Sequence, residues 1–311
     1  MRKLFLYPVG ALVTLATAVI IIGFFRPSLI HNKNYVKEKF TTPHSHYLKW
    51  RDAEIHYIDE GEGTPLLLIH GFGGNHRNFN KITEKLKTRY RVIRVDLPGF
   101  GLSDCPAVNE EKPEFAQLYK DFFRFFLDTL RLDTFYVAGN SMGGMMAWHL
   151  AAEHPARVKK LVLLASAGYD LEKTAKGLFI IRFRWLSRWM EKGLPEWASW
   201  GGARRCYADD TKIDAREVEY LNILTNREGN IRHMLRMAGD TNYPDTTLIK
   251  RISCPTLIIW GKQDAIVPAE HAYRFARDIP HAQLSLLDNC GHVPMIECTD
   301  TTSALMLDFL K

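Results

Sequence analysis

A serine flanked by glycines is the feature of the sequence that most directly predicts chemistry. Ser141 lies in a Gly-x-Ser-x-Gly pattern between Gly139 and Gly143. A strand-like run precedes the pattern and a helical run follows it, so the serine is expected on a sharp strand-to-helix turn. Side chains two positions away would collide with the backbone of such a turn, and glycine avoids this collision. The pattern therefore predicts a nucleophilic serine raised clear of a sheet.

A serine hydroxyl needs a base to accept its proton, and histidine suits that role near neutral pH. His292 is our candidate, because it lies in the loop after the strand-like run Leu284–Leu287. The acid that would orient the imidazole is expected to be Asp264, which follows another strand-like run. Asp170 is the alternative acid, whereas Asp288 is too close to His292 in sequence. Serine, aspartate and histidine thus follow one of the known orders of such triads.

Two backbone N–H groups are expected to stabilise the negative charge that develops on a carbonyl oxygen under attack. One is the N–H of Met142, directly after the serine. The other is the N–H of Phe72, in the glycine-rich stretch 70–74 that follows a strand-like run. For His70, at the start of that stretch, we expect a structural role in hydrogen bonding rather than a catalytic one.

Short apolar runs alternate with helical runs along most of the chain, which is typical of a mainly parallel sheet covered by helices on both faces. The expected strands are 53–59, 65–69, 90–95, 134–138, 158–164, 256–260 and 284–287, and the expected helices are 115–130, 142–154, 269–279 and 301–310. Each motif above follows one of these strands. Since reactive groups collect at the carboxyl ends of parallel strands, the alternation predicts an α/β fold that brings the motifs together.

The alternation divides the chain into five parts. They are a hydrophobic membrane anchor at 1–26, a polar tether at 27–45, the first part of the core at 46–168, a helical lid at 169–245 and the second part of the core at 246–311. The lid is inferred because no strand-like run occurs in that stretch, which interrupts the strand–helix pattern.

The anchor is inferred from the run Leu4–Phe25, which contains no charged residue and is long enough to cross a bilayer. The alternative is a cleaved signal peptide of a secreted protein, because Ala16-Thr17-Ala18 resembles a cleavage site. We favour the anchor, since cleavage there would leave Val19–Ile22 as an apolar new terminus. Basic residues lie on both sides of the run, so the orientation in the membrane stays open.

Composition excludes other classes. The net charge of +6 is modest, and no nucleic-acid-binding motif accompanies it. The five cysteines lack metal-ligand spacing, and their odd number excludes a complete disulfide framework, although one bridge between Cys290 and Cys298 stays open. We therefore expect no metal, cofactor or nucleic-acid partner.

Five motifs together identify a resemblance to the α/β-hydrolase superfamily over residues 47–311. They are His70-Gly-Phe-Gly-Gly74, Asp96-Leu-Pro-Gly-Phe-Gly101, Gly139-Asn-Ser-Met-Gly-Gly144, Trp260-Gly-Lys-Gln-Asp264 and Asn289-Cys-Gly-His292. Within the superfamily, the chain looks most like family V bacterial lipases and esterases and membrane-anchored monoacylglycerol lipases. The resemblance implies hydrolysis of carboxylic esters, acylglycerols above all, through an acyl-serine intermediate.

Other activities of the superfamily fit less well. C–C hydrolases that act on meta-cleavage products share the Gly-Asn-Ser-Met-Gly-Gly turn and are the alternative, but the chain departs from their pattern at Phe72 and 75–77. Epoxide hydrolases and haloalkane dehalogenases need a carboxylate where Ser141 stands. A binding protein that has lost catalysis would usually lack part of the triad, and all three residues are present here.

The expected lid is rich in tryptophan and basic residues. They are Trp185, Trp189, Trp197 and Trp200 with Arg182, Arg184, Arg188 and Lys192. Both residue types suit a bilayer interface, so the lid is expected to face lipid and to admit an ester or lipid substrate. The alternative is that the rings pack the lid onto the core.

Overall fold

The computed structural model describes residues 27–107, 115–169, 184–238 and 245–311. The predicted anchor at 1–26 and the alternative acid Asp170 lie outside these residues. Within them, no helix is both long and apolar enough to cross a membrane.

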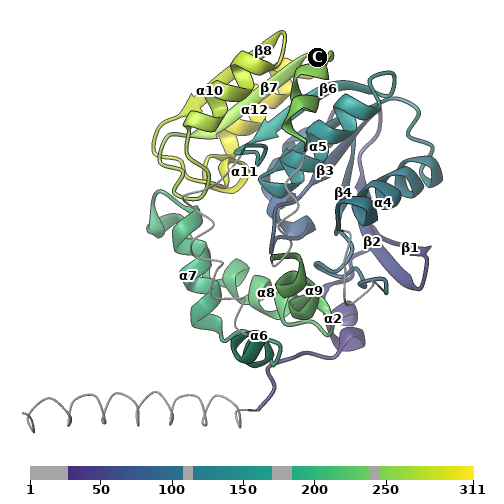
Figure 1. The fold of residues 1–311 in the computed structure, drawn as a ribbon, viewed down its shortest axis with the longest axis vertical. Helices are drawn as coiled ribbons and strands as arrows, with labels where there is room; N and C mark the ends of the chain where they lie inside the picture. The colour runs from purple at the N-terminus through teal and green to yellow at the C-terminus, as the bar shows by residue number, and fades with distance from the viewer. Residues whose placement is uncertain (1–26, 108–114, 170–183, 239–244) are drawn as a thin grey trace, which may run out of the picture.

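One eight-stranded sheet forms the centre of the fold (Figure 1). Its strands are β1 (Ser45–Trp50), β2 (Ala53–Glu60), β3 (Thr64–Ile69), β4 (Tyr90–Val95), β5 (Phe135–Asn140), β6 (Val158–Leu164), β7 (Thr256–Gly261) and β8 (Ala282–Leu287). Their spatial order is β1-β2-β4-β3-β5-β6-β7-β8. The pairs β1–β2 and β2–β4 are antiparallel, and the other pairs are parallel. The expected mainly parallel sheet is confirmed.

Helices cover both faces of the sheet because successive side chains of a strand point to opposite faces. In β3, Leu67 and Ile69 join one apolar cluster, and Leu66 and Leu68 join the other. The first cluster includes side chains of α4 (Phe115–Thr129), α5 (Met142–Glu153) and α10 (Glu270–Asp278). The second includes side chains of α3 (Asn80–Leu86), α11 (Pro294–Glu297) and α12 (Thr299–Phe309). Central strands such as β3 and β7 are therefore buried on both faces over most of their length, as their continuous apolar runs predict, whereas the edge strands β1 and β8 are partly exposed.

A helical insertion separates β6 from β7, and we use this name for residues 184–238. It contains α6 (Arg184–Met190), α7 (Glu196–Cys206), α8 (Ala215–Thr225) and α9 (Asn230–Ala238), and no strand of the sheet. Figure 1 shows these helices gathered at one end of the sheet. A methyl group placed on Gly73, after β3, would lie 3.7 Å from Sδ of Met234 in α9, so the insertion borders the carboxyl end of β3.

The stretch 27–45 differs from the expected polar tether, because it contains the helix α2 (Lys33–Phe40). Val36 and Phe40 of this helix are buried, and the Phe40 ring meets Tyr220 of α8 edge-on at 5.3 Å between centroids. Upstream, the N–H of Leu29 donates to the carbonyl of Lys192 at 2.7 Å. Only two apolar side chains of α2 point inward, too few to stand out in the sequence, and they pack onto the helical insertion.

Candidate active site

Ser141 lies between β5 and α5 in a strained backbone conformation, with φ of 54° and ψ of −119°. A methyl group on Gly139 would lie 2.1 Å from the carbonyl oxygen of Gly143, and one on Gly143 would lie 2.1 Å from the carbonyl oxygen of Ile69. Both contacts are far too short for a side chain, so the turn requires glycine on each side of the serine. The predicted strand–turn–helix geometry of the motif is thus present.

Backbone hydrogen bonds fix this turn. The N–H of Ser141 donates to the carbonyl of Leu164, at the end of β6, at 3.1 Å. The carbonyl of Ser141 accepts from the N–H of Met145 at 3.0 Å and from that of Ala167 at 2.9 Å. Because these hydrogen bonds to neighbouring elements hold the strained backbone of Ser141, the position of its Cα atom is fixed at the end of β5.

His292 and Asp264 meet as the sequence predicts, since Nδ1 of His292 lies 2.8 Å from Oδ2 of Asp264. Both side chains are almost completely buried. The other carboxylate oxygen of Asp264 accepts the N–H of Ile266 at 2.8 Å and that of Val267 at 2.9 Å. Two backbone donors therefore orient the carboxylate, and the carboxylate orients the imidazole through Nδ1.

The serine turn and the histidine loop are adjacent. The side-chain amide of Asn140, next to Ser141, donates to the carbonyl of His292 and to that of Leu164, each at 3.0 Å. Among the described residues no hydrogen bond joins Ser141 itself to His292. Catalytic hydrogen bonds are commonly long before substrate binds, and the two side chains belong to loops that touch through Asn140.

The segment expected to supply the second N–H donor runs beside the serine. A methyl group on Gly71 would lie 3.1 Å from Cβ of Ser141. The next two residues form a turn, in which Gly73 has a φ of +71°. In the described residues, the N–H groups of Phe72 and Met142 have no hydrogen-bond acceptor. Met142 is also the first residue of α5, where the helix dipole favours negative charge.

His70 has the structural role expected from the sequence. Its Nδ1 lies 2.8 Å from the carbonyl oxygen of Gly71, and its Nε2 accepts the N–H of Leu97 at 3.1 Å. Burial lowers the pKa of this fully buried imidazole, which keeps the ring neutral. Both ring nitrogens are occupied, so His70 has none left for proton transfer.

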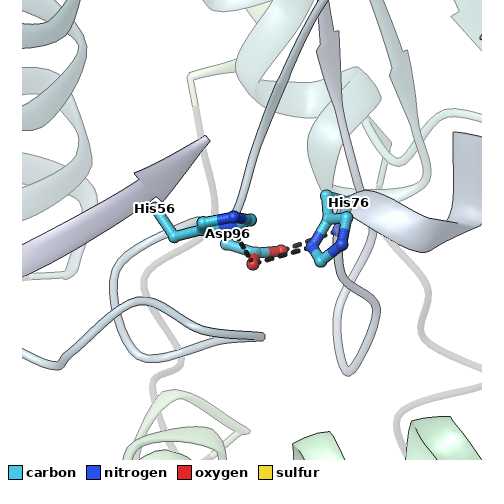
Figure 2. A group of neighbouring side chains, drawn as sticks. All are labelled: His56, His76 and Asp96. Atoms are coloured by element: carbon cyan, nitrogen blue, oxygen red, sulfur yellow. Dashed lines mark hydrogen bonds and ion pairs between the residues drawn. The ribbon is translucent and has the colours of Figure 1, made fainter. Parts of the chain in front are cut away.

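A second histidine–aspartate cluster lies near the end of β4 and was not singled out from the sequence. Figure 2 shows His56 and His76 on either side of Asp96. Their Nδ1 atoms lie 2.8 Å and 2.9 Å from the same oxygen, Oδ2 of Asp96. That oxygen also accepts the N–H of Leu102 at 2.9 Å. The three side chains are completely or almost completely buried.

These three residues are the one group of metal-ligating type found in the described part of the chain. The carboxylate is ionised: burial alone would raise the pKa of Asp96, but the adjacent histidines and their hydrogen bonds hold this pKa well below its usual value. An ionised carboxylate only accepts, so each histidine must carry its proton on Nδ1. The nitrogens facing Asp96 are therefore donors, and the group reads as a satisfied hydrogen-bond network rather than a metal site.

Sequence reasoning missed Glu297, a buried residue of α11 beside the His292 loop. Its carboxylate accepts the N–H of Gly291 at 2.6 Å, and it also accepts the N–H groups of Ala208 and Asp209, each at 3.0 Å, just after α7. The only local signal is an acidic residue in an otherwise apolar stretch. Asp288, by contrast, is exposed and pairs with Lys262, which agrees with its exclusion as the acid.

None of the five cysteines forms a disulfide, so Cys290 and Cys298 are both free thiols. Burial raises the pKa of both, so both are protonated at neutral pH. The disulfide that the sequence left open is absent from the described residues.

Comparisons with known proteins identify the family and the fold. A family model described as "alpha/beta hydrolase fold" matches residues 64–298. A pimeloyl-[acyl-carrier protein] methyl ester esterase of Legionella pneumophila is 30% identical over 83% of this chain and 99% of its own length. Lipase 1 of Psychrobacter immobilis is 31% identical over 79% of this chain and 77% of its own. Among solved structures, a meta-cleavage product hydrolase of Pseudomonas fluorescens has a TM-score of 0.73 and 25% identity, over 85% of this chain and 97% of its own.

Proposed function

The chain belongs to the α/β-hydrolase family and is of the lipase and esterase kind, and from this premise we propose that it hydrolyses carboxylic esters through Ser141, His292 and Asp264. The observation that carries the proposal is the 2.8 Å hydrogen bond between His292 and Asp264, in a loop that contacts the strained serine turn through Asn140. A nucleophile, a base and an orienting acid at the carboxyl ends of β5, β8 and β7 are the parts that acyl transfer requires.

The reaction proceeds in two halves. Oγ of Ser141 forms a bond to the ester carbonyl carbon while its proton passes to Nε2 of His292. The bond to the alcohol then breaks, and the alcohol leaves with that proton. Water repeats the sequence on the acyl-serine, which releases the acid and restores the serine. The negative charge on the carbonyl oxygen is stabilised by the N–H groups of Phe72 and Met142, which have no other acceptor among the described residues.

We propose acylglycerols or related lipid esters as the substrate class. The surface between the Phe72 turn and the insertion is mainly apolar, and it is lined in part by Phe100, Leu224 and Met234. Phe72 itself is 42% exposed and lies edge-on to Phe100. Apolar side chains beside the glycine-rich turn suit contact with an acyl chain. The similarity to a lipase supports the same class.

We also propose that the segment 169–245 acts as a lid, and that the protein associates with a membrane through Leu4–Phe25 and through this lid. Trp197 of α7 is 70% exposed, which is unusual for tryptophan and suits a bilayer interface. Secretion after cleavage of the N-terminal segment is the alternative localisation. Trp197→Ala in the full chain tests the lid: we expect a loss of about threefold to tenfold on ester in vesicles and none on a soluble ester. An equal effect of Trp197→Ala on the two substrates would contradict the lipid contact.

C–C hydrolysis of a meta-cleavage product is the second candidate, favoured by the shared Gly139–Gly144 sequence and by the structural likeness. A panel of p-nitrophenyl esters, monoacylglycerols and a ring-fission dienone acid separates the two activities. We expect turnover of the esters, loss of turnover in Ser141→Ala, and labelling of the native chain alone by a fluorophosphonate. Turnover confined to the dienone acid would establish the second candidate.

A further inference from the structure

The Asp96 cluster is hydrogen-bonded to the end of the segment that carries one of the proposed oxyanion donors, and Leu97, directly after Asp96, is hydrogen-bonded to the beginning of that segment. We propose that Asp96 and His76 are positioning residues that hold the N–H of Phe72 in register with Ser141. The proposal rests on the function proposed above, since it concerns the same oxyanion site. Neither residue touches the substrate, and each acts through the segment 70–76.

Asp96 and Leu97, which are adjacent in the chain, hold the segment 70–76 by hydrogen bonds. At its beginning, the N–H of Leu97 donates to Nε2 of His70 at 3.1 Å. At its end, the N–H of His76 donates to Oδ1 of Asp96 at 2.7 Å, and Nδ1 of the same residue lies 2.9 Å from Oδ2. Asp96 and Leu97 directly follow β4, and the segment directly follows β3, its parallel neighbour. The ends of two paired strands are thus tied together on both sides of Phe72.

The segment between the two ties is itself closed. The N–H of Gly74 donates to the carbonyl of Gly71 at 3.0 Å. The side chain of Asn75 accepts the N–H of Arg77 at 3.0 Å, and the backbone of Asn75 donates to the side chain of Asn78 at 2.8 Å. A displacement of either end of the segment 70–76 would therefore also move the turn that contains Phe72.

Asp96 is suited to serve as the fixed point. Its carboxylate is fully buried and accepts from three segments: His56 of β2, His76, and the N–H of Leu102. Hydrogen bonds to a buried charge are stronger than neutral ones. Gly101 has a φ of +55°, and a methyl group there would overlap the carboxylate at 2.3 Å, so the surrounding loop closes on it. Asp96 therefore resists movement in the directions of all three segments.

His56 and His76 form a natural matched pair. Both place Nδ1 within 2.9 Å of the same carboxylate oxygen, and both are buried. Only His76 belongs to the segment of the oxyanion turn, whereas His56 lies on β2 and is also hydrogen-bonded through Nε2 to Ser45. A purely structural role of the cluster predicts equal consequences for both histidines. A positioning role predicts that only one of them affects catalysis.

The experiment compares His76→Ala with His56→Ala in the full chain, on a soluble p-nitrophenyl ester. For His76→Ala, we expect kcat to fall about tenfold to 100-fold with KM within about threefold, since loss of one oxyanion donor costs about 100-fold to 1,000-fold. The Ki of an alkylboronic acid, whose tetrahedral adduct uses the same N–H groups, should rise by a similar factor. For His56→Ala, we expect a comparable fall in Tm with kcat within about twofold of the native chain.

His76→Asn supplies the rescue, because its amide N–H takes the place of Nδ1–H, and we expect most of kcat to return. If His76→Ala does not fold, His76→Gln replaces it: the donor is kept but displaced by one methylene, and kcat should lie below that of His76→Asn. Equal losses of kcat in the His56 and His76 variants, or a boronate Ki that does not change, would overturn the proposal. Ser141→Ala distinguishes failure of the positioning proposal from failure of the proposed function, because turnover that survives this change refutes the proposed function itself.

Discussion

In the described part of the chain, two histidine–aspartate contacts have the same length but different surroundings. Nδ1 of His292 lies 2.8 Å from Asp264, and Nδ1 of His56 lies 2.8 Å from Asp96. In the first, Nε2 has no hydrogen bond among the described residues, and the loop touches the turn of Ser141. In the second, Nε2 is bound to Ser45 and the carboxylate is shared with His76. Length alone therefore does not distinguish the proposed catalytic pair from a structural one.

The two contacts differ in whether Nε2, the second imidazole nitrogen, has a hydrogen-bond partner among the described residues. A general base needs one nitrogen oriented by the acid and another nitrogen available to the nucleophile. His292 meets both conditions, whereas His56 meets only the first. Asp264 accepts one imidazole and two backbone N–H groups, so its loop is fixed without help from a second histidine. Asp96 instead joins three segments, which suits a residue that holds them together.

The largest expected effect tests the proposed catalytic contact between His292 and Asp264 directly. We expect Ser141→Ala and His292→Ala each to lower kcat by about 10⁴-fold or more, and the double variant to be little worse, because the two residues act as a unit. Both should retain the native Tm within a few degrees. The measurement is steady-state hydrolysis of a p-nitrophenyl ester with thermal unfolding alongside. Additive losses in the double variant would contradict a shared step.

Asp264→Asn should rank next. The amide keeps the shape of the carboxylate but stabilises the wrong tautomer of His292, so we expect kcat to fall by about 10³-fold to 10⁴-fold. His56→Ala, at the other contact, is the control and should change kcat by about twofold at most. A loss at Asp264 no greater than that at His56 would remove the distinction between the two contacts.

How far the sequence predicts each contact follows from how local its signals are. Ser141, His292 and Asp264 each follow a recognisable strand within a short motif, and the fold brings strand ends together. The Asp96 cluster joins positions 20 and 40 residues apart. Asp96 was noticed only as part of a glycine-rich motif, because its partners become visible only once β2 and β4 pair.

The same reasoning applies to the boundaries of the elements. The strand 158–164 matches β6 residue for residue, since its last four residues are apolar and buried on both faces. The helix α2 was missed because its partner Tyr220 lies far along the chain, in a helical insertion whose packing no local pattern reveals. Local composition therefore predicts the apolar strands at the centre of the sheet, but it missed the half-exposed edge strand β1 and the helix α2, which depends on the insertion.

The Asp96 contact should be visible in stability as well as in the positioning of Phe72. The pKa of Asp96 in the folded state lies well below its ordinary value of 3.8, so its contribution is fully present above that pH and is lost as pH falls below it. Burial likewise lowers the pKa of His76 below 6.5, so the neutral ring stabilises the fold above pH 6.5 and less as pH falls. Both effects make the native chain less stable on acidification.

Asp96→Asn should remove the first of these contributions. We expect a loss of about 3 kcal/mol in the free energy of unfolding at pH 7, because the buried histidines lose a charged acceptor. The difference from the native chain should shrink below about pH 4. Urea unfolding at several pH values measures both quantities. A difference that does not vary with pH would show that the charge of Asp96 contributes nothing.

The smallest expected effect concerns Glu297, which links the His292 loop to the helical insertion. Glu297→Gln keeps the size of the side chain but leaves one oxygen to serve the N–H groups of Gly291, Ala208 and Asp209. Asp288→Asn is the matched control, since Asp288 belongs to the same loop but is exposed and pairs only with Lys262. We expect kcat to fall about threefold to tenfold for Glu297→Gln, through looser placement of His292, and to stay unchanged for Asp288→Asn. If the two variants behave alike, the loop is held by Asp264 and the backbone alone, and the insertion does not help to place the base.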